Sequence, residues 1–216
     1  MPTLRIGWAE VDTTPTGPVD LSGQYYHRVS RGIHSRLTAT VLAMESEGGD
    51  AAIWVALDLV TIREDFVAEL RARVAREAPD LEGSRMVVNL IHTHNAPAVD
   101  TITGIGWLEE LPNVLPAAEY RAFLMERLTA AVVEAWRGRA PGGVAPALGF
   151  ARVGHCRRAV YANGTAEMYG RTDRPDFIGM EGGESSGVDL LYTFDAARRP
   201  TGVVINVGCA AQVMEA

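Results

Sequence analysis

Short apolar runs and amphipathic segments alternate along most of the chain. Residues 36–45 alternate apolar and polar side chains, which is typical of a strand with one buried face, and the Gly-rich stretch at 47–50 predicts a turn after it. Residues 52–60 form a near-continuous apolar run, as expected for a strand buried on both faces, and residues 85–91 form another. The pattern therefore predicts a hairpin followed by a third buried strand.

Two further segments have the period of an amphipathic helix. Residues 64–77 place apolar side chains three or four positions apart, and Pro79 follows their end. Residues 116–136 repeat this spacing over a longer stretch, and Pro116 suits the first turn of a helix. Helices that alternate with strands favour an α/β fold, with a mixed β-sheet core and flanking helices.

The last third of the chain has a weaker pattern. Residues 138–146 are rich in Gly and Pro and predict a loop. Residues 164–186 are polar, Gly-rich and aperiodic, which predicts a long loop that is either functional or disordered. Strands are expected at 147–153, 187–194 and 201–207. Because the chain ends directly after the last of these strands, we expect residues 1–216 to be the N-terminal part of a larger catalytic domain.

Composition narrows the classes of function. Hydrophobic residues make up 47% of the chain and charged residues 22%, which is enough for a packed core. The net charge of -7 argues against a nucleic-acid partner. All 20 basic residues are Arg, which excludes Schiff-base and P-loop chemistry because both need a lysine.

The sequence gives no sign of a membrane segment or of a secretory leader. No apolar run reaches the roughly 18 residues that a membrane helix needs. The first twelve residues lack the apolar stretch of a signal peptide, so we expect a cytoplasmic protein, or a secreted one if a leader has been removed. The oligomeric state is not indicated.

The strongest candidate for chemistry is the segment Ile91-His92-Thr93-His94 at the end of a predicted strand. Residues i and i+2 of a strand share a face, so His92 and His94 can converge on one ion. Imidazole nitrogens suit zinc, iron or nickel, and ligands of α/β sheets usually bind at strand ends. The alternative is a pair of hydrogen-bonded loop histidines without metal.

Asp58 lies inside the apolar run 52–60, where a carboxylate is costly unless it is paired. If that strand neighbours the one before His92, Asp58 can orient a ligating imidazole. The alternative is an Asp that caps the following helix or turn.

Arg157 follows another predicted strand end and can donate two hydrogen bonds to a substrate carbonyl or carboxylate. The alternative is a surface arginine with its guanidinium in solvent. Cys209 ends the last apolar run. A thiolate is a good zinc ligand, whereas a buried inert thiol is the common alternative.

Three segments resemble, in order, the neutral/alkaline (non-lysosomal) ceramidase family. Residues 6–12 with 32–37 look like the opening strand and "GIHTRL" element of that family, residues 56–59 look like its "ADL" element, and residues 92–97 (HTHNAP) look like its "HTHSGP" element. Residues 156–161 stand where the family has "NRSPSAY". The likeness covers most of the chain and is loosest in the last third.

The resemblance implies a zinc amidohydrolase that cleaves the N-acyl bond of ceramide. His92 would then be a zinc ligand, His94 would stand beside the metal and assist the reacting water or the substrate, and Arg157 would match the family's active-site arginine. Cys209 stands where the family has its second zinc histidine, so it would either replace that ligand or mark a lost site. The family's remaining ligands, a Glu and a Tyr, lie further downstream than residue 216.

The expected cofactor is therefore Zn²⁺, and the expected partner is a small-molecule or lipid-like N-acyl substrate. The residues leave two other functions open. One is a metal hydrolase of a non-lipid amide or ester, and the other is a binding protein on the same scaffold without catalysis.

Overall fold

The computed structural model describes residues 4–24, 26–99 and 111–212. The last four residues of the chain lie outside the described part. The chain divides into two compact units. The first comprises Met1–Gly143, Thr193–Pro200 and Ala211–Ala216, and the second comprises Val144–Tyr192 and Thr201–Ala210.

The first unit is built on four adjacent strands, which are β1 (Leu4–Asp12), β2 (Thr38–Ser46), β3 (Ala51–Leu57) and β4 (Met86–Leu90). β2 is antiparallel to both β1 and β3, whereas β3 and β4 are parallel. The full hydrogen-bonded order is β10-β9-β5-β1-β2-β3-β4. The three added strands are β5 (Ala140–Phe150), β9 (Gly187–Asp195) and β10 (Pro200–Val207).

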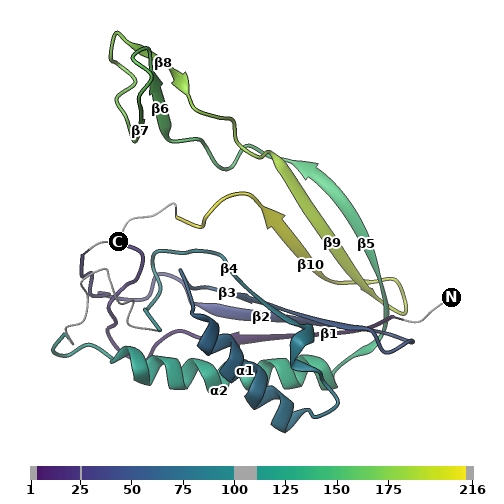
Figure 1. Ribbon diagram of the computed structural model, residues 1–216. Helices are drawn as coiled ribbons and strands as arrows, with labels where there is room; N and C mark the ends of the chain where they lie inside the picture. The colour runs from purple at the N-terminus through teal and green to yellow at the C-terminus, as the bar shows by residue number, and fades with distance from the viewer. Residues whose placement is uncertain (1–3, 25, 100–110, 213–216) are drawn as a thin grey trace. The chain divides into compact units, whose positions relative to one another are not determined.

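Two α-helices cover one face of β1–β4 (Figure 1). Helix α1 (Glu64–Glu77) lies between the parallel strands β3 and β4 in sequence, and a 3-10 turn (Gly83–Arg85) leads into β4. Helix α2 (Ala117–Arg137) packs on β1, β2 and α1. The structure confirms both predicted helices, the hairpin and the strand before His92, with ends that differ by no more than three residues.

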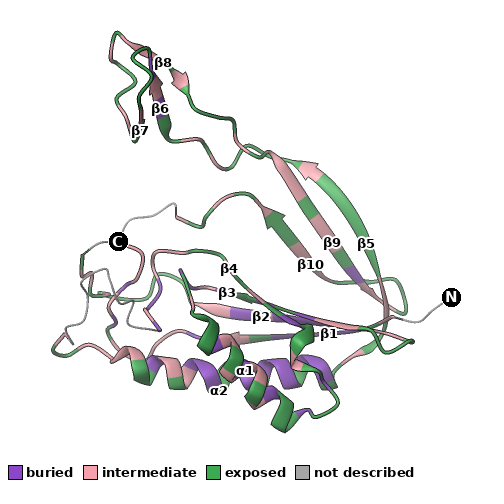
Figure 2. Cartoon of the chain, viewed as in Figure 1, coloured by how far each residue is buried: buried purple, intermediate pink, exposed green. Residues whose placement is uncertain are grey.

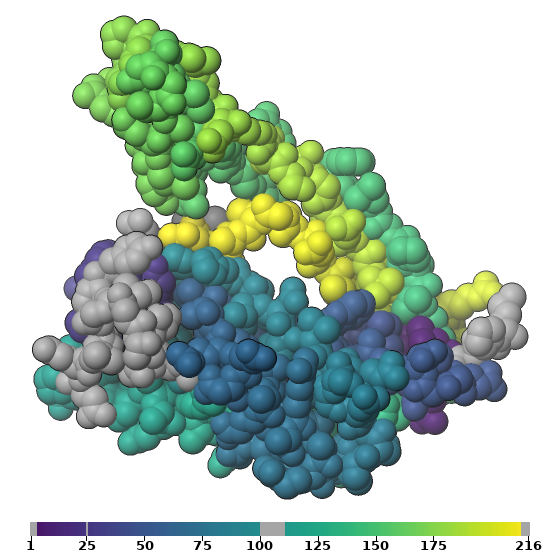
Figure 3. All heavy atoms as spheres, viewed as in Figure 1, coloured from purple at the N-terminus to yellow at the C-terminus, as the bar shows by residue number. Residues whose placement is uncertain are grey.

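Helix α1 buries one stripe and exposes the rest. Phe66, Leu70 and Val74 are fully buried, at the spacing of one helical turn, while the polar side faces outward. The outer surface of α1 forms part of the side of the unit that is turned to the viewer in Figure 3. The helix ends before Pro79, as expected, since proline disfavours the helical conformation of the residue before it.

The core of the first unit lies between the sheet and the two helices. Figure 2 shows buried residues along β1–β3 and on the inner sides of α1 and α2. Gly7 of β1 permits this packing, since a Cβ atom there would lie 2.0 Å from the carbonyl oxygen of Ala135 in α2. The largest fully buried side chains of this core include Tyr120, Phe66, Ile53, Leu57, Leu70, Met86 and Leu124.

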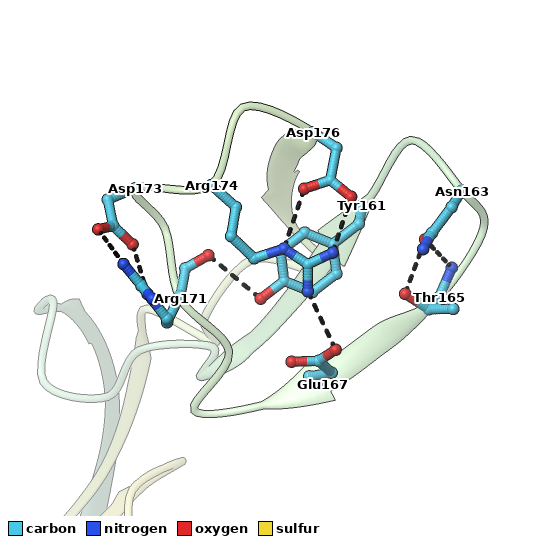
Figure 4. A network of polar contacts seen from close by, with 8 residues as sticks. All are labelled: Tyr161, Asn163, Thr165, Glu167, Arg171, Asp173, Arg174 and Asp176. Carbon is cyan, nitrogen blue, oxygen red and sulfur yellow. Dashed lines mark hydrogen bonds and ion pairs between the residues drawn. The ribbon is translucent and has the colours of Figure 1, made fainter.

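The second unit contains a small sheet in the order β7-β6-β8, formed by β6 (Arg158–Tyr161), β7 (Ala166–Met168) and β8 (Phe177–Met180). Polar contacts hold its loops (Figure 4). The Arg174 guanidinium lies 3.7 Å from the centre of the Tyr161 ring and donates to Asp176 at 2.9 and 2.7 Å and to Glu167 at 3.2 Å. Tyr161 is fully buried and donates to the Arg171 carbonyl at 3.1 Å.

Two predictions for the last third were wrong. Residues 138–146 were expected to form a loop, but β5 begins at Ala140, where Leu4–Ile6 of β1 pair with it. Residues 164–186 were expected to be structureless, but they contain β7 and β8. Among the described residues, no helix combines the length and the apolar character needed to cross a membrane.

Candidate functional site

The candidate site lies where β3 and β4 end side by side. These strands are parallel, with Leu57 opposite Leu90, so their carboxyl ends meet at the same edge of the sheet. The Ile91 amide continues the pairing by donating to the Leu57 carbonyl at 3.2 Å. Asp58 follows β3 directly, and His92 follows β4 after one residue, Ile91. The two strands are therefore neighbours, which is the condition on which a role for Asp58 at this site depended.

His92 is held by its backbone and by its ring. Its φ is +59°, in the left-handed region that non-glycine residues seldom adopt and that clusters at functional sites. The ring nitrogen Nδ1 lies 3.0 Å from the Val60 carbonyl oxygen. Because a carbonyl only accepts, Nδ1 must carry the proton, which leaves the lone pair of a neutral imidazole on Nε2. This is the arrangement that metal-ligating histidines usually have.

The His94 ring lies beside that of His92. Their centroids are 5.0 Å apart and their planes make an angle of 67°, so one ring presents its edge to the other. His92 is exposed, whereas His94 is half-buried. The expectation that the two imidazoles come together is met, although they do so in an irregular segment after β4 rather than on a regular strand.

An N-terminal segment packs alongside the two histidines. Leu21 and Pro97 form an antiparallel bridge, and the Ser22 amide donates to the Ala96 carbonyl at 2.9 Å. This register brings Gly23 against His94, and Arg28 reaches the same segment. Sequence reasoning missed both residues, because neither a lone Gly nor an Arg in a loop carries a signal of its own.

Asp58 contacts β2. Its Oδ2 atom accepts hydrogen bonds from the backbone amide of Thr38 at 2.8 Å and from the Thr38 hydroxyl at 3.2 Å. Its own amide donates to the Thr38 carbonyl at 3.1 Å. The carbonyl of Val60 thus makes the contact with the His92 ring that Asp58 was expected to supply. A role of Asp58 in catalysis stays a prediction.

Arg157 belongs to the second unit and pairs with Tyr169. Its Nη1 donates to the Tyr169 hydroxyl at 2.7 Å, and its guanidinium carbon lies 5.1 Å from the centre of the Tyr169 ring. The Tyr169 amide donates in turn to the Arg157 carbonyl at 2.8 Å. Both side chains are exposed. The pair can present a guanidinium and a phenol together to a polar group.

Cys209 also belongs to the second unit and follows β10. It is a half-buried free thiol, and its amide donates to the Val207 carbonyl at 2.8 Å. A Cβ atom on Gly154 would lie 3.6 Å from its sulfur, which is ordinary van der Waals contact. Its assignment as a metal ligand stays a prediction.

Two of the described residues, His92 and His94, have side chains of a type that could hold a metal. Within residues 4–24, 26–99 and 111–212, no group of three or more His, Cys, Asp or Glu side chains is arranged to hold a metal ion. His92 and His94 are two donors of the type zinc prefers, and a catalytic zinc usually takes three protein ligands. The pair fits zinc in its chemistry and in the orientation of the His92 ring.

Comparison with solved structures identifies the fold. Over 95% of this chain and 31% of the other, it superposes on the crystal structure of neutral ceramidase from Pseudomonas aeruginosa with a TM-score of 0.70 and 19% identity. A structure described as ceramidase complexed with C2 gives a TM-score of 0.68 with 18% identity over the same shares. No protein-family model and no curated protein sequence matches the chain. The chain thus has a ceramidase-like fold and spans about a third of the length of those proteins.

Proposed function

We propose that the chain is part of a zinc-dependent hydrolase that cleaves an N-acyl amide bond, as in ceramidases. The observation that carries the proposal is the hydrogen bond from Nδ1 of His92 to the Val60 carbonyl oxygen. It leaves the lone pair on Nε2 available to a metal ion. The left-handed backbone at His92 and the adjoining His94 ring support it, as does the ceramidase-like fold.

In this proposal His92 would hold the metal, and His94 would either join it as a second ligand or stand beside the metal. Zinc, when bound, supplies Lewis acidity that polarises an amide carbonyl and brings the pKa of water toward about 7. Where it stands beside the metal and not on it, the His94 imidazole would exchange a proton with the reacting water or with the leaving amine, a task suited to an imidazole near neutral pH.

Zinc content provides the first test. We expect zinc in the purified chain, a loss of it in His92→Ala, and a smaller loss in His94→Ala. His34→Ala is the matched control, because His34 is an exposed histidine in the same unit and has no place in the proposed site. Equal zinc in His92→Ala, His34→Ala and the unchanged protein would remove His92 from the metal site.

Substrate class provides the second test. The chain, with zinc or with a chelator, is offered an N-acyl sphingoid amide, a short N-acyl amino compound and an ester of the same acyl chain. Chelator-sensitive cleavage of the sphingoid amide alone supports a ceramidase. Cleavage of the short amide or the ester alone supports the non-lipid hydrolase, and binding without cleavage supports the scaffold protein.

A further inference from the structure

The backbone pairing between residues 20–22 and 96–98 fixes what lies next to His94. Besides the Leu21–Pro97 bridge and the Ser22 amide bond, the Ala98 amide donates to the Asp20 carbonyl at 3.4 Å. Leu21, Pro97 and Ala96 are buried, so apolar contacts secure the pairing. In an antiparallel register, the residue after Ser22 must come beside Asn95 and His94.

Gly23 occupies that place, and no larger residue fits it. Its φ is +104°, a conformation that glycine adopts without steric cost. A Cβ atom at this position would lie 2.5 Å from Cγ, 2.6 Å from Nδ1 and 2.9 Å from Cδ2 of the His94 ring. These distances are all shorter than any tolerated carbon contact. The Gly23 backbone therefore packs against the imidazole and restricts the rotation of the His94 side chain.

Arg28 fixes the backbone of the same histidine. Its Nη2 donates to the His94 carbonyl and, at 3.1 Å, to the Ser22 carbonyl, while its Nη1 lies 3.4 Å from Oδ1 of Asn95. The forked guanidinium thus joins the two paired segments, which the single ammonium of a lysine cannot do as well. Asp20 supports this placement, because its Oδ1 accepts the Arg28 amide at 3.0 Å.

We infer that Gly23 and Arg28 are positioning residues that set the orientation of the His94 imidazole toward His92, Gly23 by contact with the ring and Arg28 through the backbone. The inference rests on the proposed function insofar as the oriented ring serves a metal site. Its structural content, the fixed ring, is measurable without metal.

The test uses the full chain and Co²⁺ as a spectroscopic probe for zinc. We expect Gly23→Ala to weaken Co²⁺ binding about 10–100-fold, the usual effect of disturbing the surroundings of a ligand. Gly49→Ala is the matched control, since Gly49 also has a positive φ, +84°, but a Cβ atom added there would meet no other atom within 4 Å. It shares the backbone strain and lacks the clash, so its Co²⁺ affinity should stay within about twofold of the unchanged chain.

Arg28 is tested by the same titration. We expect Arg28→Ala to weaken Co²⁺ binding by a similar factor and Arg28→Lys to restore part of the loss. Arg31→Ala, at an exposed position nearby, should bind like the unchanged chain. Circular dichroism at 222 nm verifies that each variant keeps its helices.

A second readout needs no metal. In the metal-free chain, NMR should show a nuclear Overhauser effect between the Gly23 α-protons and the His94 ring, and Gly23→Ala should shift the His94 ring resonances, whereas Gly49→Ala should not. If the unchanged chain binds no Co²⁺, the proposed function fails and the NMR result alone decides the inference. If it binds Co²⁺ and Gly23→Ala binds equally well with unshifted ring resonances, the inference is overturned while the proposed function stands.

Discussion

The left-handed backbone at His92 predicts that glycine stabilises the folded protein more than alanine does at this position, which reverses their usual order. At most positions glycine is less stabilising than alanine, because its unfolded chain has more conformations to lose, by about 0.5–1 kcal/mol. At a φ of +59°, however, any side chain with a Cβ atom costs about 1–2 kcal/mol that glycine avoids. We therefore expect His92→Gly to be more stable than His92→Ala by about 0.5–1 kcal/mol.

The comparison of His92→Gly with His92→Ala isolates the contribution of the backbone conformation to stability. Both variants lose the hydrogen bond from Nδ1 to the Val60 carbonyl, so its contribution cancels in the difference. The difference corresponds to about 1–4 °C in melting temperature for a chain of this size. Ala68→Gly, at an exposed position of α1, is the control and should lower stability by about 1 kcal/mol, as glycine does in an ordinary helix.

Chemical denaturation in the presence of a chelator provides the measurement, since bound metal would stabilise the native state by mass action. The signal is circular dichroism at 222 nm, and both α-helices belong to the first unit, so it reports on the unit that contains His92. An alanine variant as stable as the glycine variant, or more stable, would refute the assigned backbone conformation and the strain argument with it.

Two further predictions concern the scaffold. Gly7→Ala should destabilise the first unit by about 2–3 kcal/mol, because the new methyl group meets the backbone of α2 at Ala135, whereas Gly17→Ala, with open space around it, should change stability by less than about 0.5 kcal/mol in the same urea titration. The Asp12 carboxyl has its pKa lowered to about 2, chiefly by hydrogen bonds from Thr14. Its stabilising effect is therefore complete above the unfolded-state pKa near 4 and is lost as pH falls toward 2, so Asp12→Asn should flatten the loss of stability over that range.

The sequence predicted the elements that are encoded by local periodicity. Helix α1 was predicted with the correct ends because its apolar stripe and Pro79 agree. The first part of β5, before the strand expected from residue 147, was missed because Pro141, Gly142 and Gly143 are typical of loops. Gly142 is required there for a reason that lies elsewhere in the chain, since a Cβ atom would come within 2.4 Å of the Phe194 carbonyl oxygen. A contact between residues so far apart in the chain leaves no pattern in the sequence around Gly142.

The candidate site shows the same division. The pairing of His92 with His94 could be predicted because it depends on two nearby residues at a strand end. The partner of the His92 ring could not, since it is a backbone carbonyl, that of Val60, and carbonyls have no signature in a sequence. The small sheet of the second unit was missed because its strands have only three or four residues each, too few for an apolar period to show.

The bridge between Leu21 and Pro97 joins segments more than seventy positions apart, and this sets when the histidines acquire their surroundings. The hairpin of β2 and β3 and both helices close over short distances, so they can form early, whereas a distant pairing must await the collapse of the chain. A few backbone bonds at the edge of the unit also open more readily than the buried strands. Amide exchange at Ser22 should thus be faster than at Val55. The pairing next to His94 would open and close while the sheet stays folded.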